Sequence, residues 1–233
     1  MLSKQSKVLV VGQGLAGTLI SYLLKKAGWD VHVISSKEAP AASEVAAGMW
    51  NPVAFRRVIP TWNASQMVRA LHQVYGDLQE ELGSTFLYKR KIHRFFPNDD
   101  YRTTWNENTT KEELLPYIGA SYPDKGEVVE GGYVDLSHMI SAWRNQLLGN
   151  QQFDFGEMDQ IQFMESKWLF HGQAFDHLVI CTGLGMIKSL EEQDWLRKNK
   201  GELLLLNSGK VDKSTILNNG KWVLPLEEGG YKL

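Results

Sequence analysis

The sequence predicts an α/β fold built on a parallel sheet, and three observations near its N-terminus support this prediction. Residues Lys7–Val11 form an uninterrupted apolar run rich in valine, which is typical of a strand buried on both faces. A glycine-rich turn at Gly12–Gly17 follows at once, and leucines and alanines then recur at helical spacing up to Gly28. A second short run at Asp30–Ser35 completes a strand–helix–strand unit. Strands joined by such a crossover lie parallel in one sheet.

The glycine turn has the spacing GxGxxG, and each glycine has a separate physical role. Gly12 permits the tight turn, Gly14 lets the backbone approach a pyrophosphate, and Gly17 permits close packing of the helix on the strand. Leu15 and Ala16 begin the helix, whose free amide groups and partial positive charge favour phosphate. The unit is therefore predicted to be a Rossmann-type dinucleotide-binding site, with these five residues in contact with the cofactor.

The end of the second strand departs from the usual dinucleotide-binding pattern. An acidic residue commonly stands there to bind the ribose hydroxyls, whereas this chain has Ser35 followed by Ser36. A serine hydroxyl can still form a hydrogen bond with a ribose, so both serines are candidate cofactor contacts. No arginine stands nearby to receive a 2′-phosphate, which argues against NADP.

Composition and charge exclude several classes of protein. With 25 basic and 27 acidic side chains the net charge is −2, which makes a nucleic-acid partner unexpected. The single cysteine, Cys181, excludes an internal disulfide and a cysteine-rich zinc site, and its apolar surroundings predict a buried small hydrophobe. No apolar stretch is long enough to span a membrane, and the N-terminus has no signal-peptide pattern, so the cytoplasm is the expected location.

The segment that follows the second strand indicates whether the expected cofactor is a flavin or a nicotinamide dinucleotide. Residues 38–52 are mostly small and apolar, which is unusual for a solvated loop. Residues 42–49 resemble the A-S-x-x-A-A-G-M segment of the D-amino-acid oxidase and glycine oxidase family, in which this segment runs along FAD. The resemblance implies FAD as the cofactor and adds five expected contacts, namely Ala42, Ser43, Ala47, Gly48 and Met49.

Further matches to this family occur in the same order along the chain. They are Gly132–Asp135 before an amphipathic helix, the strand ending in Cys181-Thr182-Gly183, the K-G-E segment at Lys200–Glu202, and a hairpin from Lys221 to Leu233. The amphipathic helix should bury Leu136, Met139, Ile140, Trp143 and Leu147. Strands are expected over 153–164 and 168–170. Met158, Thr182 and Gly183 join the expected cofactor contacts.

The resemblance also implies two interleaved domains. Residues 1–83 and 128–199 are expected to form the Rossmann-type FAD-binding domain, including a helix that Gly83 closes. Residues 84–127 and 200–233 are expected to form an antiparallel substrate sheet with a long strand over 86–96. Family members continue past the hairpin and complete this sheet, so the substrate domain is expected to be incomplete and the 233-residue chain inactive.

The activity that the resemblance implies is oxidation of a small amine or amino acid, of the D-amino-acid or N-substituted-glycine type. Hydride would pass from the substrate to N5 of the flavin, and the resulting imine would hydrolyse. Trp222 occupies the position at which the family often has an active-site tyrosine. An indole cannot carry a proton as a phenol does, so Trp222 is expected either to line an apolar amine pocket or to serve as an ordinary hairpin aromatic. The sequence does not indicate the oligomeric state.

Two other functions stay open. Lys37–Pro40 and Asn51-Pro52 resemble the oxidase domain of a bifunctional tRNA wobble-uridine-modifying enzyme, which acts on an amine attached to a tRNA nucleoside. A non-catalytic dinucleotide-binding module is the other possibility. A pyridine-nucleotide enzyme or a flavin disulfide reductase would need a second GxGxxG or a CxxxxC pair, and the sequence has neither.

Overall fold

A computed structural model describes residues 6–37, 42–183, 201–207 and 212–233. Contacts divide the chain into two compact units: unit 1 comprises Met1–Ala46 and Leu136–Gly201, and unit 2 comprises Ala47–Asp135 and Glu202–Leu233. Residues 47–83 and 128–135, expected in the FAD-binding domain, belong to unit 2 by their contacts. Residues 38–41 and Lys200, which carry parts of the predicted motifs, lie outside the described residues.

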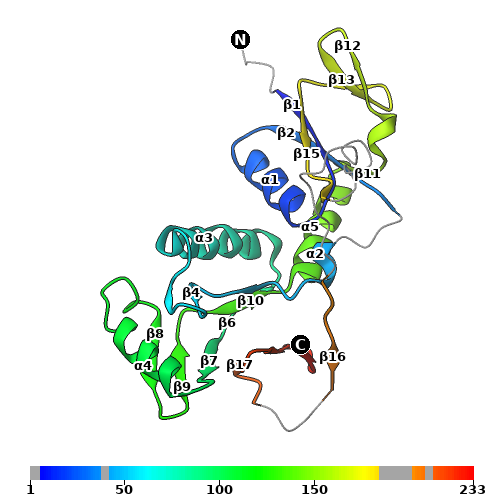
Figure 1. The fold of residues 1–233 in the computed structure, drawn as a ribbon. Coiled ribbons are helices and arrows are strands. Elements are labelled where there is room, and N and C mark those ends of the chain that lie inside the picture. Colours follow the sequence, from blue (N-terminus) through cyan, green and yellow to red (C-terminus); the bar gives the residue numbers. More distant parts are fainter. Residues whose placement is uncertain (1–5, 38–41, 184–200, 208–211) are drawn as a thin grey trace, which may run out of the picture. The chain divides into compact units, whose positions relative to one another are not determined.

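Unit 1 contains a parallel four-stranded sheet. Its strands are β1 (Lys7–Val11), β2 (Asp30–Ser35), β11 (Phe153–Phe155) and β15 (His177–Ile180), and their order is β11-β2-β1-β15. Counted along the chain, the strands lie in the order third, second, first, fourth, as in a Rossmann fold. Figure 1 shows β1 between β2 and β15. The predicted α/β fold class and the parallel first unit are confirmed.

The described residues of unit 1 include three α-helices: α1 (Leu15–Lys26), α2 (Ala42–Val45) and α5 (Leu136–Gly149). Gly28 ends α1 with a positive φ of 88°, and the Gly28 and Trp29 amides donate to the carbonyls of Lys25 and Leu24. This is the Schellman arrangement, which the sequence indicated by placing glycine there. The five apolar residues predicted on one side of α5 are all buried.

Buried hydrogen bonds join α1 to α5. The Trp143 indole donates to Ser21 Oγ at 2.8 Å, and Ser21 Oγ donates to the Thr18 carbonyl at 2.9 Å. The Tyr22 ring meets Trp143 edge-on with 5.6 Å between centroids. Both polar groups are thereby satisfied inside the core, so the two helices are held in one register.

The expected strand over 153–164 is wrong. The chain leaves β11 at Gly156, forms the short 3-10 helix η1 (Met158–Gln160), and continues as β12 (Gln162–Met164). A side chain at Gly156 would meet the Phe170 ring at 2.7 Å, and Glu157 and Gln160 cap η1 reciprocally. β12 pairs with β13 (Lys167–Phe170) and β14 (Gln173–Phe175) in a separate antiparallel sheet. Because of this break, residues 153–164 contribute β11 to the parallel sheet and β12 to the antiparallel sheet.

Unit 2 is built on a seven-stranded sheet with the order β16-β19-β18-β17-β7-β9-β8. The strands are β7 (Lys91–Phe95), β8 (Ile118–Ser121), β9 (Lys125–Val128), β16 (Leu205–Leu206), β17 (Thr215–Asn218), β18 (Trp222–Pro225) and β19 (Tyr231–Lys232). Neighbouring strands are antiparallel except for β7 and β17, which are parallel. The expected antiparallel sheet thus contains one parallel pair. Its two strands, β7 and β17, are far apart in the sequence, and a long connection allows parallel pairing.

Among its described residues, unit 2 also has smaller strands and two helices. A three-stranded sheet contains β3 (Met49–Trp50), β10 (Gly132–Val134) and β6 (Leu87–Lys89), and a two-stranded sheet contains β4 (Val53–Ala54) and β5 (Ile59–Pro60). Helix α3 (Ala64–Leu82) ends at Gly83 as expected, at a φ of 58°. Helix α4 (Asp99–Asn108) was not predicted from the sequence, and its N-cap Asn98 accepts a hydrogen bond from the Tyr101 amide at 2.8 Å.

The single long strand expected over 86–96 is also wrong. β6 and β7 belong to different sheets, and the chain changes sheet at Arg90. The Arg90 amide donates to the Gly131 carbonyl at 2.9 Å between the two sheets. The run of basic and apolar residues continues without interruption through Arg90, so the sequence pattern could not reveal that the strand is broken there.

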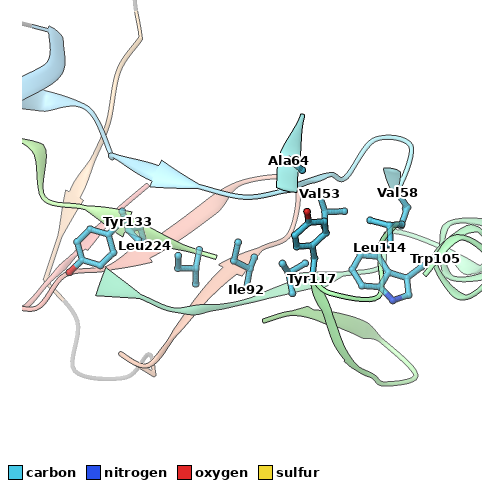
Figure 2. Packing of buried hydrophobic residues seen from close by; sticks show 11 residues of the cluster. Val53, Val58, Ala64, Ile92, Trp105, Leu114, Tyr117, Tyr133 and Leu224 are labelled. Carbon is cyan, nitrogen blue, oxygen red and sulfur yellow. The ribbon is translucent and has the colours of Figure 1, made fainter. Parts of the chain in front are cut away.

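The core of unit 2 is a cluster that extends along the seven-stranded sheet. Figure 2 shows its side chains in a row from Tyr133 and Leu224 at one end to Trp105 at the other. Trp105 is fully buried, and its indole donates to Ser121 Oγ at 3.0 Å. A Cβ at Gly126 in β9 would lie 2.1 Å from the Trp105 ring, so the ring requires a glycine beneath it.

We therefore expect Gly126→Ala to lower the free energy of unfolding by about 3 kcal/mol, because the buried Trp105 ring cannot retreat from the added methyl group. Urea denaturation followed by tryptophan fluorescence measures the change. Gly149→Ala, at the end of α5 with nothing within 4 Å of its Cβ, is the matched control and should leave the midpoint unchanged or raise it. Equal midpoints for the two variants would contradict the packing argument.

Candidate cofactor site

The glycine turn lies where β1 ends, and its backbone touches the segment that follows β15. Gly12 has a φ of 94°, and a Cβ there would lie 2.5 Å from the Cys181 carbonyl oxygen. A Cβ at Gly17 would lie 1.8 Å from the Gly12 carbonyl oxygen, because α1 packs tightly on the turn. The predicted reasons for glycine at Gly12 and Gly17, a tight turn and close packing, are thus present in the structure.

The N-terminus of α1 opens at the same edge of the sheet. Gly14 is its N-cap and has extended backbone angles (φ −82°, ψ −159°), and no acidic residue lies in the first turn with Leu15 and Ala16. The Leu15 amide donates to Ser43 Oγ at 3.0 Å. The structure therefore brings Ser43, next to Ala42 at the start of α2, to the helix terminus that was predicted to receive phosphate.

The turn also lies where the order of the strands in the sheet reverses. β2 lies on one side of β1 and β15 on the other, so the strand order reverses at β1. Ligands of open α/β sheets bind at such a reversal, beyond the carboxyl ends of the strands. Thr182 and Gly183 follow β15 at this edge, and Thr182 Oγ1 is buried with no hydrogen-bond partner among the described residues.

The two serines and Met158 occupy the other half of the same edge. Ser35, the last residue of β2, accepts a hydrogen bond from the Gln13 amide at 3.4 Å, and Ser36 follows it. Met158 begins η1 three residues beyond β11, the strand next to β2, and is 36% exposed. Because the strands are parallel, their carboxyl ends share one edge, and these residues lie along it.

Three polar residues beneath the turn were missed by the sequence analysis. Gln13 is 1% exposed; its amide nitrogen donates to the Ile140 carbonyl at 3.0 Å, and its amide oxygen accepts from Arg144 Nε. Arg144 also donates to Glu44 of α2 at 3.1 Å. A polar side chain between two glycines was the only sequence feature that pointed to this network. Through it, α5 fixes both the glycine turn and α2.

The remaining predicted contacts lie in unit 2. Gly48 has a φ of 66°, and its carbonyl accepts a hydrogen bond from the Val134 amide at 3.0 Å. Met49 pairs with Tyr133 between β3 and β10. Ala47, Met49 and Trp222 are partly buried and pack against the same buried cluster. The structure therefore brings the predicted Trp222 and two predicted cofactor contacts to one apolar cluster.

Trp222 belongs to a cluster of aromatic side chains that also contains the Arg94 guanidinium. It stacks on Phe55 with 5.6 Å between ring centroids. The Arg94 guanidinium lies 5.6 Å from the Phe55 ring and 4.8 Å from the Tyr101 ring. Arg94 donates to Tyr101 Oη at 3.3 Å and to Asn218 at 2.5 Å, so its orientation is fixed. Neither Phe55 nor Arg94 was predicted, since nothing local in the sequence distinguishes them.

Comparison with known proteins identifies this arrangement. Residues 7–231 match the family model described as FAD dependent oxidoreductase, DAO. The chain belongs to the DAO family. Similar solved structures include glycine oxidase from Geobacillus kaustophilus (TM-score 0.66, 18% identity) and glycine oxidase from Bacillus cereus ATCC 14579 (TM-score 0.67, 19% identity), each covering 98% of this chain and 70% of the other. Iminodiacetate oxidase from Chelativorans sp. BNC1 (TM-score 0.67, 15% identity) covers 97% of this chain and 70% of its own.

FAD is the cofactor of the DAO family, and the residues at the sheet edge fit it. A pyrophosphate needs amide donors and an approach without side chains, which α1 and Gly14 provide. The unpartnered Thr182 hydroxyl is a buried group that a ligand oxygen would satisfy. Burial raises the pKa of the Cys181 thiol, which is consistent with the predicted small hydrophobe at the base of the turn.

Two other kinds of site are not found within the described parts of this DAO-family chain. No group of histidine, cysteine and acidic side chains there could hold a metal ion. None of the helices described is long and apolar enough to cross a bilayer.

We expect Gly14→Val to weaken FAD binding by about tenfold or more, because a branched side chain at the N-cap occupies the approach to the helix amides. The extended backbone at this position accepts valine, so the fold should persist. Quenching of tryptophan fluorescence during FAD titration measures the affinity, and circular dichroism checks the fold.

Gly76→Val in α3 is the matched control, because nothing lies within 4 Å of its Cβ. FAD affinity should be unchanged in this variant. Equal affinities for the Gly14 variant and the wild type would mean that the phosphate groups bind elsewhere.

Proposed function

We propose that this protein oxidises a small amine or amino acid, of the D-amino-acid or N-substituted-glycine type, in an FAD-dependent reaction. The observation that carries the proposal is the group formed by Trp222, Phe55 and Arg94. It presents an apolar wall beside a fixed guanidinium. An amino acid has the matching features, an apolar carbon skeleton next to a carboxylate.

Bound FAD supplies the hydride acceptor. The proposed task of the protein residues is to bind and orient the substrate. Trp222 and Phe55 would exclude water from the substrate carbon, and Arg94 would orient the carboxylate. Gly12, Gly14, Gly17, Leu15 and Ala16 with Ser43, Thr182 and Gly183 would hold the pyrophosphate end of FAD. Ser35, Ser36 and Met158 would lie toward its nucleoside, and Ala42, Ala47, Gly48 and Met49 would follow its length.

The proton of the substrate amine has to leave before the carbon–hydrogen bond breaks, because the nitrogen lone pair must be free. Trp222 cannot accept this proton. The nearby phenols do not do so at neutral pH, since burial raises the pKa of Tyr101 and, with repulsion from Tyr88, raises the pKa of Tyr133 to about 12. Solvent is therefore the proposed acceptor, and the amine would react in its neutral form.

This proposal predicts a simple pH dependence. The value of kcat/KM should rise with pH through the pKa of the substrate amine and then level off, with no protein group adding a second step below about pH 10. Two amines of different pKa, tested with the same preparation, should shift the midpoint by the difference between their pKa values. A midpoint that stays fixed when the amine is changed would identify a base on the protein.

The substrate class is tested by anaerobic mixing of the FAD-loaded protein with sarcosine, D-alanine and lactate. Loss of the visible absorbance of oxidised flavin reports reduction, and a spectral shift without bleaching reports binding alone. We expect a response to the two amines; a spectral shift without bleaching would instead fit the expectation from the sequence that the substrate domain is incomplete. A response to lactate alone would overturn the proposal.

Trp222→Ala should raise the KM for the responding amine about tenfold, because an aromatic contact contributes on the order of 1–1.5 kcal/mol. Trp222→Phe should keep most of the affinity. Trp62→Ala is the matched control, since Trp62 is 85% exposed. If both alanine variants bind the amine as the wild type does, Trp222 is only a structural aromatic of the hairpin.

A further inference from the structure

A cavity of about 970 Å³ lies in unit 2, on the sheet face opposite the buried cluster. Lys91 and His93 of β7 line it, while Ile92 between them is fully buried in the cluster. Alternate side chains of a strand point to opposite faces, so the two basic residues share the outer face. Strand pairing places Thr215 beside Lys91 and Glu127 beside His93. Residues distant in sequence thus meet in one cavity.

The lining of this cavity, here named the basic pocket, carries more positive than negative charge. Its basic side chains are Lys89, Arg90, Lys91 and Lys213, with His93 among them. Its two acidic side chains are Glu127 and Glu227, and Lys89 pairs with Glu130, which lies outside the lining. An excess of cations on a concave surface raises the local concentration of anions.

Both acids in the basic pocket are already neutralised. Glu127 accepts hydrogen bonds from Lys91 at 3.1 Å and His93 at 3.4 Å. Burial alone would raise the pKa of Glu127, but these hydrogen bonds outweigh burial and hold the pKa below its usual value. Glu227 forms an ion pair with Arg90. Neither carboxylate is left to balance a further cation.

Within the described residues, Lys213 is the cation of the basic pocket that lacks an ion-pair partner. Lys213 forms no ion pair with any residue in the described parts of the chain, and it lines the pocket two residues before β17 begins at Thr215. Arg90 Nε is buried and makes no hydrogen bond there, although the same guanidinium pairs with Glu227. Because Arg90 Nε is closed to solvent, an anion in the pocket would be bound chiefly by Lys213 Nζ, with the positive charge of Arg90 in the same lining.

We infer that the basic pocket binds a small molecule that carries a phosphate group. Phosphate offers two negative charges and several acceptor oxygens, which match a point charge at Lys213 within a basic lining better than one carboxylate does. The cavity has the size of a small-molecule site, and the chain's net charge of −2 disfavours a long polyanion such as RNA. The inference does not depend on the proposed oxidation.

The test is calorimetric titration of the 233-residue chain with inorganic pyrophosphate at fixed ionic strength. Saturating FAD is present throughout, so that the phosphate-binding turn at Gly12–Gly17 is filled. We expect one binding site, weakened about tenfold by Lys213→Gln, which removes one charge-assisted hydrogen bond. Lys213→Arg should keep most of the affinity. Lys111→Gln, an exposed lysine of unit 2 outside the pocket, is the matched control and should have no effect.

Four results would overturn the inference. They are absence of pyrophosphate binding, equal weakening by the Lys213→Gln and Lys111→Gln changes, citrate binding as tightly as pyrophosphate, and a single-stranded RNA oligonucleotide binding more tightly with the same dependence on Lys213. Failure of the amine screen leaves this measurement unaffected, because the titration requires no turnover.

Discussion

Unit 1 depends on the close approach of two backbone segments at the carboxyl edge of its parallel sheet. The Cys181 amide donates to the Val11 carbonyl at 2.7 Å, and this pairing brings the Cys181 carbonyl against Gly12. Both partners are backbone, so neither can move aside for a side chain. The same approach aligns the start of α1 and the Thr182 hydroxyl at one edge. FAD binding in this family member is therefore tied to the register between β1 and β15.

Polar contacts beneath this edge hold the helices in place. Gln13 connects the glycine turn to α5 through Ile140 and Arg144, and Arg144 connects α5 to α2 through Glu44. Gln13 is almost fully buried, so losing one partner would leave an unsatisfied polar group in the core. Such a network favours one arrangement of turn and helices over others that would bury equal apolar area.

The sequence predicted those parts that depend on local spacing. The glycine turn, the Schellman end of α1 at Gly28 and the buried side of α5 follow from periodicity and from glycine conformations. The change of sheet at Arg90 and the partners of Gln13 depend on residues far away in sequence, which no local pattern encodes. Helix α4 could have been found from Asn98 followed by two aspartates, a capping pattern, despite its weak periodicity. In the candidate site, the glycines followed from motif spacing and Ser43 from the family resemblance, whereas neither pointed to Phe55 or Arg94.

The order of the strands also governs when each sheet can form during synthesis. β1 needs β15, which ends at Ile180, and β7 needs β17, which ends at Asn218. A ribosome must therefore make most of the chain before either central pairing closes. Until then β1 and β7 each lack a neighbour, and such high contact order slows folding while leaving strand edges exposed. Neither unit can be cut out as a continuous piece, so dissecting the protein into separately expressed halves requires a circular permutation.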